Sequence, residues 1–156
     1  MHIQIGSQAP DFTAPSSDGD ITLSALKGSP VVLYFYPKDN TPGCTKEACG
    51  FRDVRGELEA KGAKVFGVSK DSLQSHERFT EKFQLNFPLI SDPELEIHQA
   101  YGAWGDKKLY GKTFLGVIRT TVLIDGDGVI RKIWPKVKVN GHVDAVLAAI
   151  DELQSS

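Results

Sequence analysis

The sequence predicts an α/β protein in which helices flank a central mixed β-sheet and a small β-hairpin lies at the N-terminus. Three observations predict this fold class. The apolar run 31–36 is typical of a buried central strand and leads directly into a helical pattern. Strands and helices then alternate along the chain. Residues 125–128, Asp-Gly-Asp-Gly, form a hairpin turn between the last two predicted strands, which makes the sheet mixed.

The N-terminal half is expected to supply the hairpin, two strands and two helices. Two short segments, 11–13 and 21–23, flank a turn-rich stretch at 16–20, which predicts the hairpin. Glycine and capping residues mark where the helices begin and end. In order, we expect a hairpin over 11–23, a helical turn at 24–28, a strand at 31–36, a helix from near Cys44 to about Lys61 with Gly62 as its C-cap, a strand at 65–68, and a helix capped by Asp71 or Ser72 with Leu73, Phe79 and Phe83 on its apolar face.

The C-terminal half is expected to complete the sheet and to end in a helix. The glycine-rich segment 101–112 has no clear hydrophobic period, so we expect a surface loop there. The elements around it are a short strand that ends in a turn over 87–93, a short helix from Pro93 to about Tyr101, strands at 120–124 and 129–134, and a final helix from about 141 to 153 that buries Val143, Val146, Leu147 and Ile150.

Length and composition indicate one globular domain spanning residues 1–156. The chain is 40% hydrophobic and 24% charged with a net charge of −2, so nothing indicates binding to nucleic acid. We expect no membrane association, because no segment approaches the roughly 18 apolar residues of a membrane span. Neither is a secretory signal visible at the N-terminus. Two cysteines in such a chain are typical of a reducing compartment, which predicts a cytoplasmic protein.

The two cysteines, Cys44 and Cys49, lie where the apolar strand turns into a helix. Pro37, Pro42 and Gly43 break the regular backbone just before Cys44, which places it in the first turn of the helix. Unpaired N–H groups and the positive end of the helix dipole there favour a thiolate. Cys44 is therefore a candidate nucleophile, whereas Cys49, between apolar neighbours, also fits a packed and inert thiol.

The spacing of the two cysteines limits how they can interact. In an unbroken helix their Cα atoms lie roughly 8 to 9 Å apart and their side chains point about 140° apart. A disulfide needs Cα atoms within about 7 Å, so it can form only if the first turn and a half unwinds. The residues thus encode either two unrelated thiols or a redox switch coupled to local unfolding. A zinc site is disfavoured, because the four histidines are scattered without ligand-like spacing.

The segment around Cys44 resembles the active-site motif of a known family. The pattern Pro37-x-x-x-Thr41-x-x-Cys44 is similar to that of the peroxiredoxins, and residues 36–49 resemble the bacterioferritin-comigratory-protein/PrxQ branch. The resemblance extends to segments 6–12, 67–69, 87–92 and 119–125, and so covers nearly the whole chain. It implies a thioredoxin-like fold that reduces hydrogen peroxide and organic hydroperoxides through cysteine alone, without metal, haem or flavin.

The resemblance also implies a role for each matching residue. Cys44 corresponds to the peroxidatic cysteine, which becomes a sulfenic acid, and Cys49 to the resolving cysteine, which forms an intramolecular disulfide with it. Arg119 corresponds to the active-site arginine that stabilises the thiolate and binds the peroxide. The remaining matches are Thr41, which orients the peroxide and the thiolate, Pro37, which shields the pocket, and Glu47, which holds Arg119 in place.

The implied partners are a hydroperoxide substrate and a dithiol reductant, thioredoxin or a similar protein. The resemblance favours a monomer, and an intramolecular disulfide requires no partner subunit. Three other interpretations use the same residues. A protein disulfide oxidoreductase is disfavoured by the four-residue gap and by Thr41; a redox sensor would be oxidised by peroxide but turn over poorly; and a purely structural domain leaves Arg119 and Thr41 unexplained.

Overall fold

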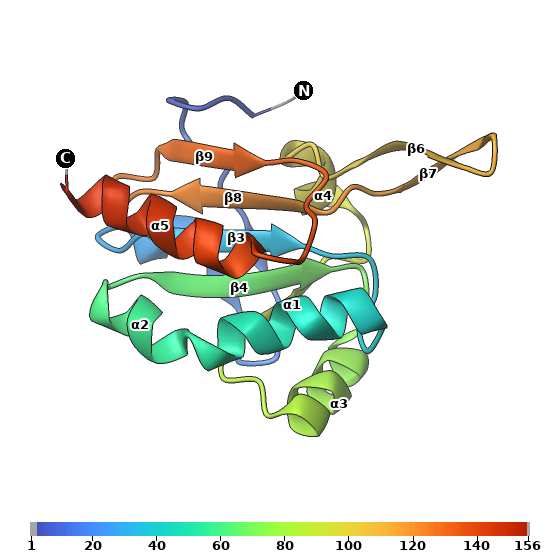
Figure 1. Ribbon diagram of the computed structural model, residues 1–156, viewed down its shortest axis with the longest axis horizontal. Coiled ribbons are helices and arrows are strands. Elements are labelled where there is room, and N and C mark those ends of the chain that lie inside the picture. The colour runs from blue at the N-terminus through green and yellow to red at the C-terminus, as the bar shows by residue number, and fades with distance from the viewer. Residues whose placement is uncertain (1–2, 156) are drawn as a thin grey trace.

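A computed structural model describes residues 3–155 and contains a five-stranded mixed sheet in the order β5-β4-β3-β8-β9, flanked by helices (Figure 1). The central strand β3 pairs in parallel with β4 and antiparallel with β8. The predicted α/β class and its mixed sheet are therefore confirmed. The strands are β3 (Val31–Phe35), β4 (Lys64–Ser69), β5 (Leu89–Ser91), β8 (Thr120–Ile124) and β9 (Ile130–Trp134).

Both faces of the sheet are covered, which explains why β3 is apolar at every position. All five of its side chains are buried. On one face, Tyr34 packs in a hydrophobic cluster with residues of α1 (Pro42–Asp53), α3 (Leu73–Phe83) and α5 (His142–Ser155). On the other face, Phe35 packs with residues of α4 (Glu96–Ala100) and the N-terminal segment. A strand buried on both faces carries no alternation of polar and apolar residues.

The N-terminal hairpin and the last two strands agree with the sequence. β1 (Thr13–Ala14) and β2 (Ile21–Thr22) pair antiparallel, and the 3₁₀ helix η1 (Leu23–Leu26) follows them. β8 and β9 pair antiparallel across the predicted turn, where Gly128 has a φ of 83°. Within residues 3–155 no helix is both long and apolar enough to cross a membrane.

The cysteine-bearing helix is shorter than predicted. The sequence predicts one helix to about residue 61, but the chain forms α1 and then a separate helix α2 (Arg55–Ala60), with Val54 non-helical between them. β-Branched Val54 and the following Gly56 are weak helix formers, which favours a break at this point. Gly62 follows α2 with a φ of 71°, the conformation expected of a C-cap glycine.

Helix α3 begins as predicted, but its buried face is different. The Ser72 side chain accepts a hydrogen bond from the Ser75 backbone N–H and caps the helix. Phe79 is buried as expected, whereas Leu73, at the first helical position, remains 37% exposed. The fully buried residue one turn later is His76, whose ring finds polar partners inside the protein.

The segment predicted as a surface loop at 101–112 forms most of a β-hairpin instead. β6 (Trp104–Leu109) and β7 (Lys112–Val117) pair antiparallel around the two residues Tyr110 and Gly111. Both turn residues have positive φ, 53° and 77°, as a type I′ turn requires. Tyrosine is an uncommon residue in that conformation, so the turn lacks the usual Asn-Gly signal. The hairpin projects from the body as a long arm (Figure 1).

Candidate active site

Cys44 lies in the first turn of α1, where the sequence places it. Thr41 is the N-cap residue in an extended conformation, and Pro42 occupies the first helical position, where its missing N–H costs no hydrogen bond. The Cys44 side chain is 1% exposed and belongs to the hydrophobic cluster beneath α1. Its sulfur therefore sits at the positive end of a helix, in a site that is largely shielded from water.

Arg119 brings a positive charge to this sulfur. It directly precedes β8, whose first residue Thr120 pairs with Phe35 at the end of β3, so it lies at the edge of the sheet from which the Cys44 loop leaves. Its Nη2 donates to Cys44 Sγ at 3.2 Å, and its Nη1 donates to Glu47 Oε1 at 2.6 Å. The guanidinium thus bridges two acceptors that lie almost one helical turn apart on α1.

Glu47 is fully buried beside this arginine. Burial raises the pKa of Glu47 to about 7, although the charge and hydrogen bond of Arg119 act in the opposite direction. Its second carboxylate oxygen, Oε2, has no hydrogen-bond partner among the described residues. Burial alone would lower the pKa of Arg119, but the negative charges of Glu47 and Cys44 raise it. Arg119 therefore keeps its positive charge beside the sulfur.

The other two loop residues expected at the site lie on the path between β3 and α1. The Thr41 hydroxyl donates to the Lys38 carbonyl at 2.8 Å, which braces the turn before Cys44 and leaves the hydroxyl oxygen free to accept. Pro37 is half-buried directly after the fully buried Tyr36. Both residues therefore shape the loop that leads to Cys44.

Cys49 lies on the same helix and is half-buried, and both cysteines are free thiols. Gly50, which follows it, packs against α5 so closely that an added Cβ would lie 2.9 Å from Val143 Cγ2. Because α1 runs unbroken from Pro42 to Asp53, the two thiols point to different sides of the helix. A bond between them requires this part of α1 to unwind.

A buried polar network holds the loop before Cys44, and sequence reasoning missed it. Asp39 accepts from the Tyr36 hydroxyl at 2.6 Å and from the Ser75 hydroxyl at 2.8 Å, and it lies 2.7 Å from His76 Nδ1. The other ring nitrogen of His76 is 2.9 Å from the Ile90 carbonyl oxygen, so both ring nitrogens face acceptors. The network ties the Cys44 loop to α3 and β5 through residues far apart in the sequence.

A second histidine lies close to the Arg119 side of the site. His142 is buried, its Nε2 is 2.8 Å from the Thr121 hydroxyl, and its ring packs edge-on against Trp134 and Phe51. Burial, together with the positive charge of Arg119, lowers the pKa of His142 to about 4. His142 is therefore neutral near pH 7. Among residues 3–155, no group of three or more His, Cys, Asp or Glu side chains could hold a metal ion.

A protein-family model and several known proteins match this chain over most of its length. The model of the AhpC/TSA family matches residues 5–133. Peroxiredoxin Bcp of Bacillus subtilis is 44% identical over 154 residues, which cover 98% of each chain. Peroxiredoxin Bcp of Escherichia coli is 42% identical over 151 residues, covering 96% of this chain and 97% of that relative.

Solved structures of a bacterioferritin comigratory protein and of a PrxQ have the same fold as this chain. The bacterioferritin comigratory protein of Xanthomonas campestris, studied for its alkyl peroxide reduction activity, superimposes with a TM-score of 0.86 at 43% identity over 90% of each chain. A cysteine mutant of Xylella fastidiosa PrxQ superimposes with a TM-score of 0.92 at 34% identity over 99% of each chain. The thioredoxin-like fold expected from the sequence is confirmed.

Proposed function

Because the chain belongs to the AhpC/TSA family, as a peroxiredoxin of the Bcp/PrxQ type, it is a thiol peroxidase, and we propose that Cys44 is its peroxidatic and Cys49 its resolving cysteine. The observation that carries this proposal is the 3.2 Å hydrogen bond from Arg119 to Cys44 Sγ. A fixed guanidinium donor at the sulfur, together with the N-terminus of α1, favours the thiolate that peroxide chemistry needs.

In the first step, the Cys44 thiolate attacks one oxygen of the hydroperoxide. A sulfur–oxygen bond forms, the oxygen–oxygen bond breaks, and the departing oxygen takes up a proton to leave as water or an alcohol. Arg119 lies where it can stabilise the charge that develops on the departing oxygen. Thr41 and Pro37, on the loop before Cys44, orient the peroxide and exclude water from it.

In the second step, the Cys49 thiolate attacks the sulfur of the Cys44 sulfenic acid. A disulfide forms and hydroxide leaves, taking a proton to become water. Because both cysteines lie in α1, its N-terminal part must unwind, which separates Glu47 from Arg119 and breaks the hydrogen bond of Lys46 with Asn140. The disulfide lies within one chain, so the cycle can run in a monomer.

In the third step, a dithiol reductant such as thioredoxin restores the two thiols. Two successive thiol–disulfide exchanges pass two electrons and two protons to the Cys44–Cys49 disulfide and leave the reductant oxidised. Hydrogen peroxide and organic hydroperoxides are the proposed substrates. The alkyl peroxide activity described for the Xanthomonas campestris relative supports the organic class.

The proposal is tested by the two cysteine variants in a coupled assay with thioredoxin, thioredoxin reductase and NADPH. Cys44→Ser should abolish turnover, because no sulfenic acid can form. Cys49→Ser should react with one equivalent of peroxide, and the sulfenic acid should be captured by dimedone, but turnover with thioredoxin should stall. Normal turnover of Cys49→Ser would show that the resolving role is wrong.

A further inference from the structure

The β6–β7 arm, residues 104–117, has no role in the chemistry above, yet it extends well beyond the body of the molecule (Figure 1). Its strands form a two-stranded sheet of their own, apart from the five-stranded sheet. A two-stranded hairpin is at best marginally stable in water unless another surface covers it. The arm is therefore a candidate for contact with another molecule.

The side chains of the arm are both apolar and basic. Of the five large hydrophobic side chains exposed among the described residues, three belong to it: Tyr110 is 95%, Leu115 62% and Phe114 44% exposed. Asp106 is the one acidic residue within 104–117, against the three lysines Lys107, Lys108 and Lys112. Phe114 and Leu115 are consecutive residues of β7 and therefore face opposite sides of the arm, so both faces expose apolar side chains. Exposed apolar side chains gathered on one element mark an interaction site, and this charge balance fits an acidic partner.

The arm starts at the active-site edge of the sheet. β7 leads through Val117 and Ile118 directly into Arg119, and the Ile118 N–H donates to the Ala103 carbonyl at the base of the arm. At the same base, Lys70, which follows the end of β4, lies 5.9 Å from the centre of the Trp104 ring. The end of the molecule that carries Cys44 therefore also carries the arm.

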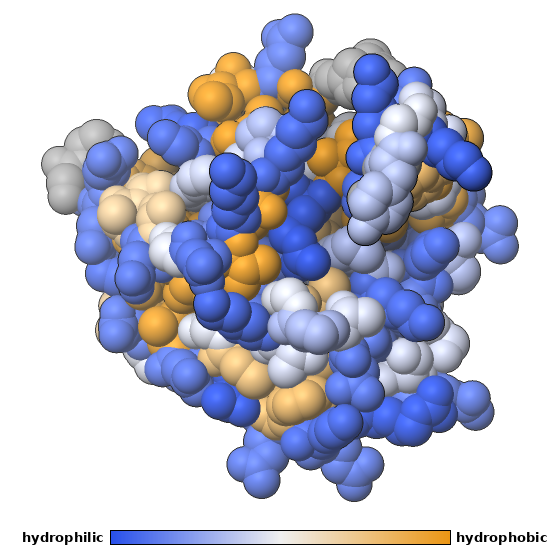
Figure 2. All heavy atoms as spheres, turned by 45° about the vertical axis from the view of Figure 1, so that its right-hand side comes forward, coloured by the Kyte–Doolittle hydropathy of each residue, from blue (hydrophilic) through white to orange (hydrophobic). Residues whose placement is uncertain are grey.

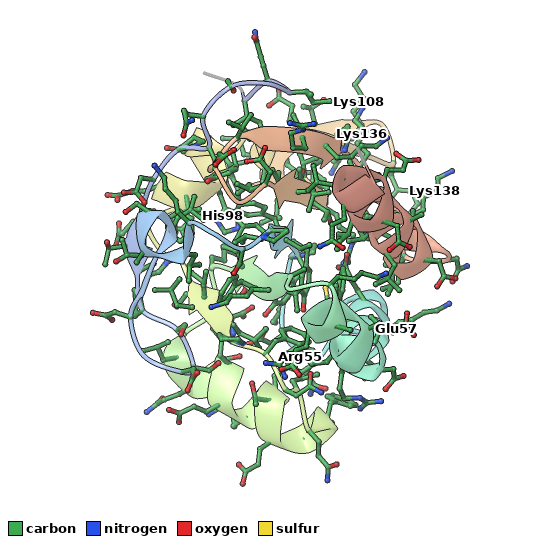
Figure 3. All side chains as sticks on the ribbon, turned by 90° about the vertical axis from the view of Figure 1, so that its left-hand side faces the viewer. Arg55, Glu57, His98, Lys108, Lys136 and Lys138 are labelled. Carbon is green, nitrogen blue, oxygen red and sulfur yellow. The ribbon has the colours of Figure 1, made fainter. Side chains whose placement is uncertain are left out.

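The exposed charges around Cys44 have the same sign as those of the arm. Lys38 and Lys46 are exposed on either side of the cysteine, whereas Asp39 and Glu47 are buried. Lys136 and Lys138 lie at the surface on the segment that joins β9 to α5 (Figure 3), and the Val137 N–H between them donates to the Arg119 carbonyl. Figure 2 brings this end forward and shows hydrophobic side chains interspersed among hydrophilic ones.

We propose that the β6–β7 arm is the docking surface for the protein dithiol that reduces the Cys44–Cys49 disulfide, a partner with an apolar patch and an acidic rim around its thiols. The inference rests on the proposed function, which requires such a reductant. A hydroperoxide is too small to need a docking surface of this length, and a lipid surface carries no thiol. A surface beside the disulfide best fits the molecule that must exchange thiols with it.

The test compares an arm variant, Tyr110→Ser/Leu115→Ser, with Ile5→Ser as a matched control. Ile5 is exposed to the same extent as Leu115, 62%, and neighbours Gly6, whose N–H donates to the Ile130 carbonyl at the far end of the sheet. Turnover is measured with a bacterial thioredoxin system and, separately, with dithiothreitol. The arm variant should raise the KM for thioredoxin at least about tenfold and leave the dithiothreitol rate unchanged, while Ile5→Ser changes neither.

A second variant tests the charges. Lys107→Glu/Lys108→Glu should lower kcat/KM for thioredoxin and should reduce its dependence on salt, because the lysines would no longer attract an acidic rim. Equal KM values for thioredoxin in the arm variant and Ile5→Ser would overturn the proposal. The proposal would also be overturned if the only effect of the arm substitutions were a loss of binding to anionic lipid vesicles or the loss of a dimer.

The proposed function can be checked independently in the same samples. One equivalent of hydrogen peroxide should remove two hydrogens from the intact mass of both wild type and arm variant. Absence of that loss would refute the disulfide step itself. A disulfide that forms in both proteins and that thioredoxin reduces equally well in both would overturn the docking proposal alone.

Discussion

Replacing Glu47 by Gln should change how the Cys44–Cys49 disulfide responds to pH. Glu47 lies between the two cysteines, on the part of α1 that must unwind for them to bond. In the helix it is fully buried, and its pKa is raised to about 7 by burial, against the opposing effect of Arg119. Unwinding exposes the carboxyl group to water, where its pKa returns to about 4.5. Disulfide formation should therefore release one proton from Glu47 between these pH values.

The sign and size of the effect follow from the two pKa values. Below pH 4.5 Glu47 is protonated in both states, and its contribution to the free-energy preference for the helical over the unwound state is at its full value. Between pH 4.5 and about 7 the unwound state loses its proton first, so this contribution falls, and it has disappeared above about pH 7. A difference of about 2.5 pKa units corresponds to about 3 kcal/mol, or roughly 300-fold in the equilibrium between the two states.

The assay is the reduction potential of the disulfide, measured by equilibration with thiol redox buffers between pH 5 and 8. Each proton released adds about 30 mV per pH unit to the slope of a two-electron couple. Between pH 5 and 7 wild type should therefore have a slope about 30 mV per pH unit steeper than Glu47→Gln, whose amide still accepts from Arg119 but does not titrate. The same two thiols form the same disulfide in both proteins, so the difference between the two slopes reports on residue 47.

Glu57→Gln is the control, since Glu57 lies exposed on α2 (Figure 3) and should leave the slope unchanged. His142 also lies near Arg119, but its pKa of about 4 falls below this pH range. Equal slopes for wild type and Glu47→Gln would show that Glu47 releases no proton when the disulfide forms. Glu47 would then either stay buried in the disulfide form or be ionised already in the helix.

Four further outcomes are expected. Arg119→Ala should slow sulfenic acid formation by about 10²- to 10³-fold in stopped-flow measurements, because the donor to Cys44 Sγ is lost; an unchanged rate would contradict its role. Thr41→Val should slow the same step while leaving the far-ultraviolet circular dichroism unchanged. Asp39→Ala should lower the free energy of unfolding in urea by about 3 kcal/mol, because it leaves buried partners unpaired. Since burial lowers the pKa of His142 to about 4, the unfolded state takes up a proton first, so stability should fall as the pH drops from about 6.5 to about 4, and His142→Gln should flatten that decline.

The sequence was sufficient to predict those helices, strands and turns that depend mainly on residues close together in the chain. The apolar run of β3, the turn between β8 and β9 and the start of the cysteine helix were all predicted, because each depends on neighbouring residues. The β6–β7 arm was missed because its turn uses Tyr110 in a left-handed conformation and its strands bury few side chains. The break at Val54 was missed because the apolar spacing continues across it.

Some residues of the site could likewise be predicted from their sequence neighbours, and others could not. Position in the first turn of a helix marks Cys44 from the sequence alone. Arg119 lies 75 residues away, and only the resemblance to the peroxiredoxins connected the two before their hydrogen bond was seen. The Asp39–His76 network gave no local signal, because its members come from a loop, a helix and a strand that only the folded chain brings together.

Mass spectrometry can show whether Cys44 and Cys49 form a disulfide during peroxide reduction. Reduced protein is treated with one equivalent of hydrogen peroxide, and the intact mass and a peptide map are recorded. We expect a rapid loss of two hydrogens and a linked pair of peptides that contain Cys44 and Cys49. A stable gain of one oxygen on Cys44, or an unchanged mass, would contradict this expectation.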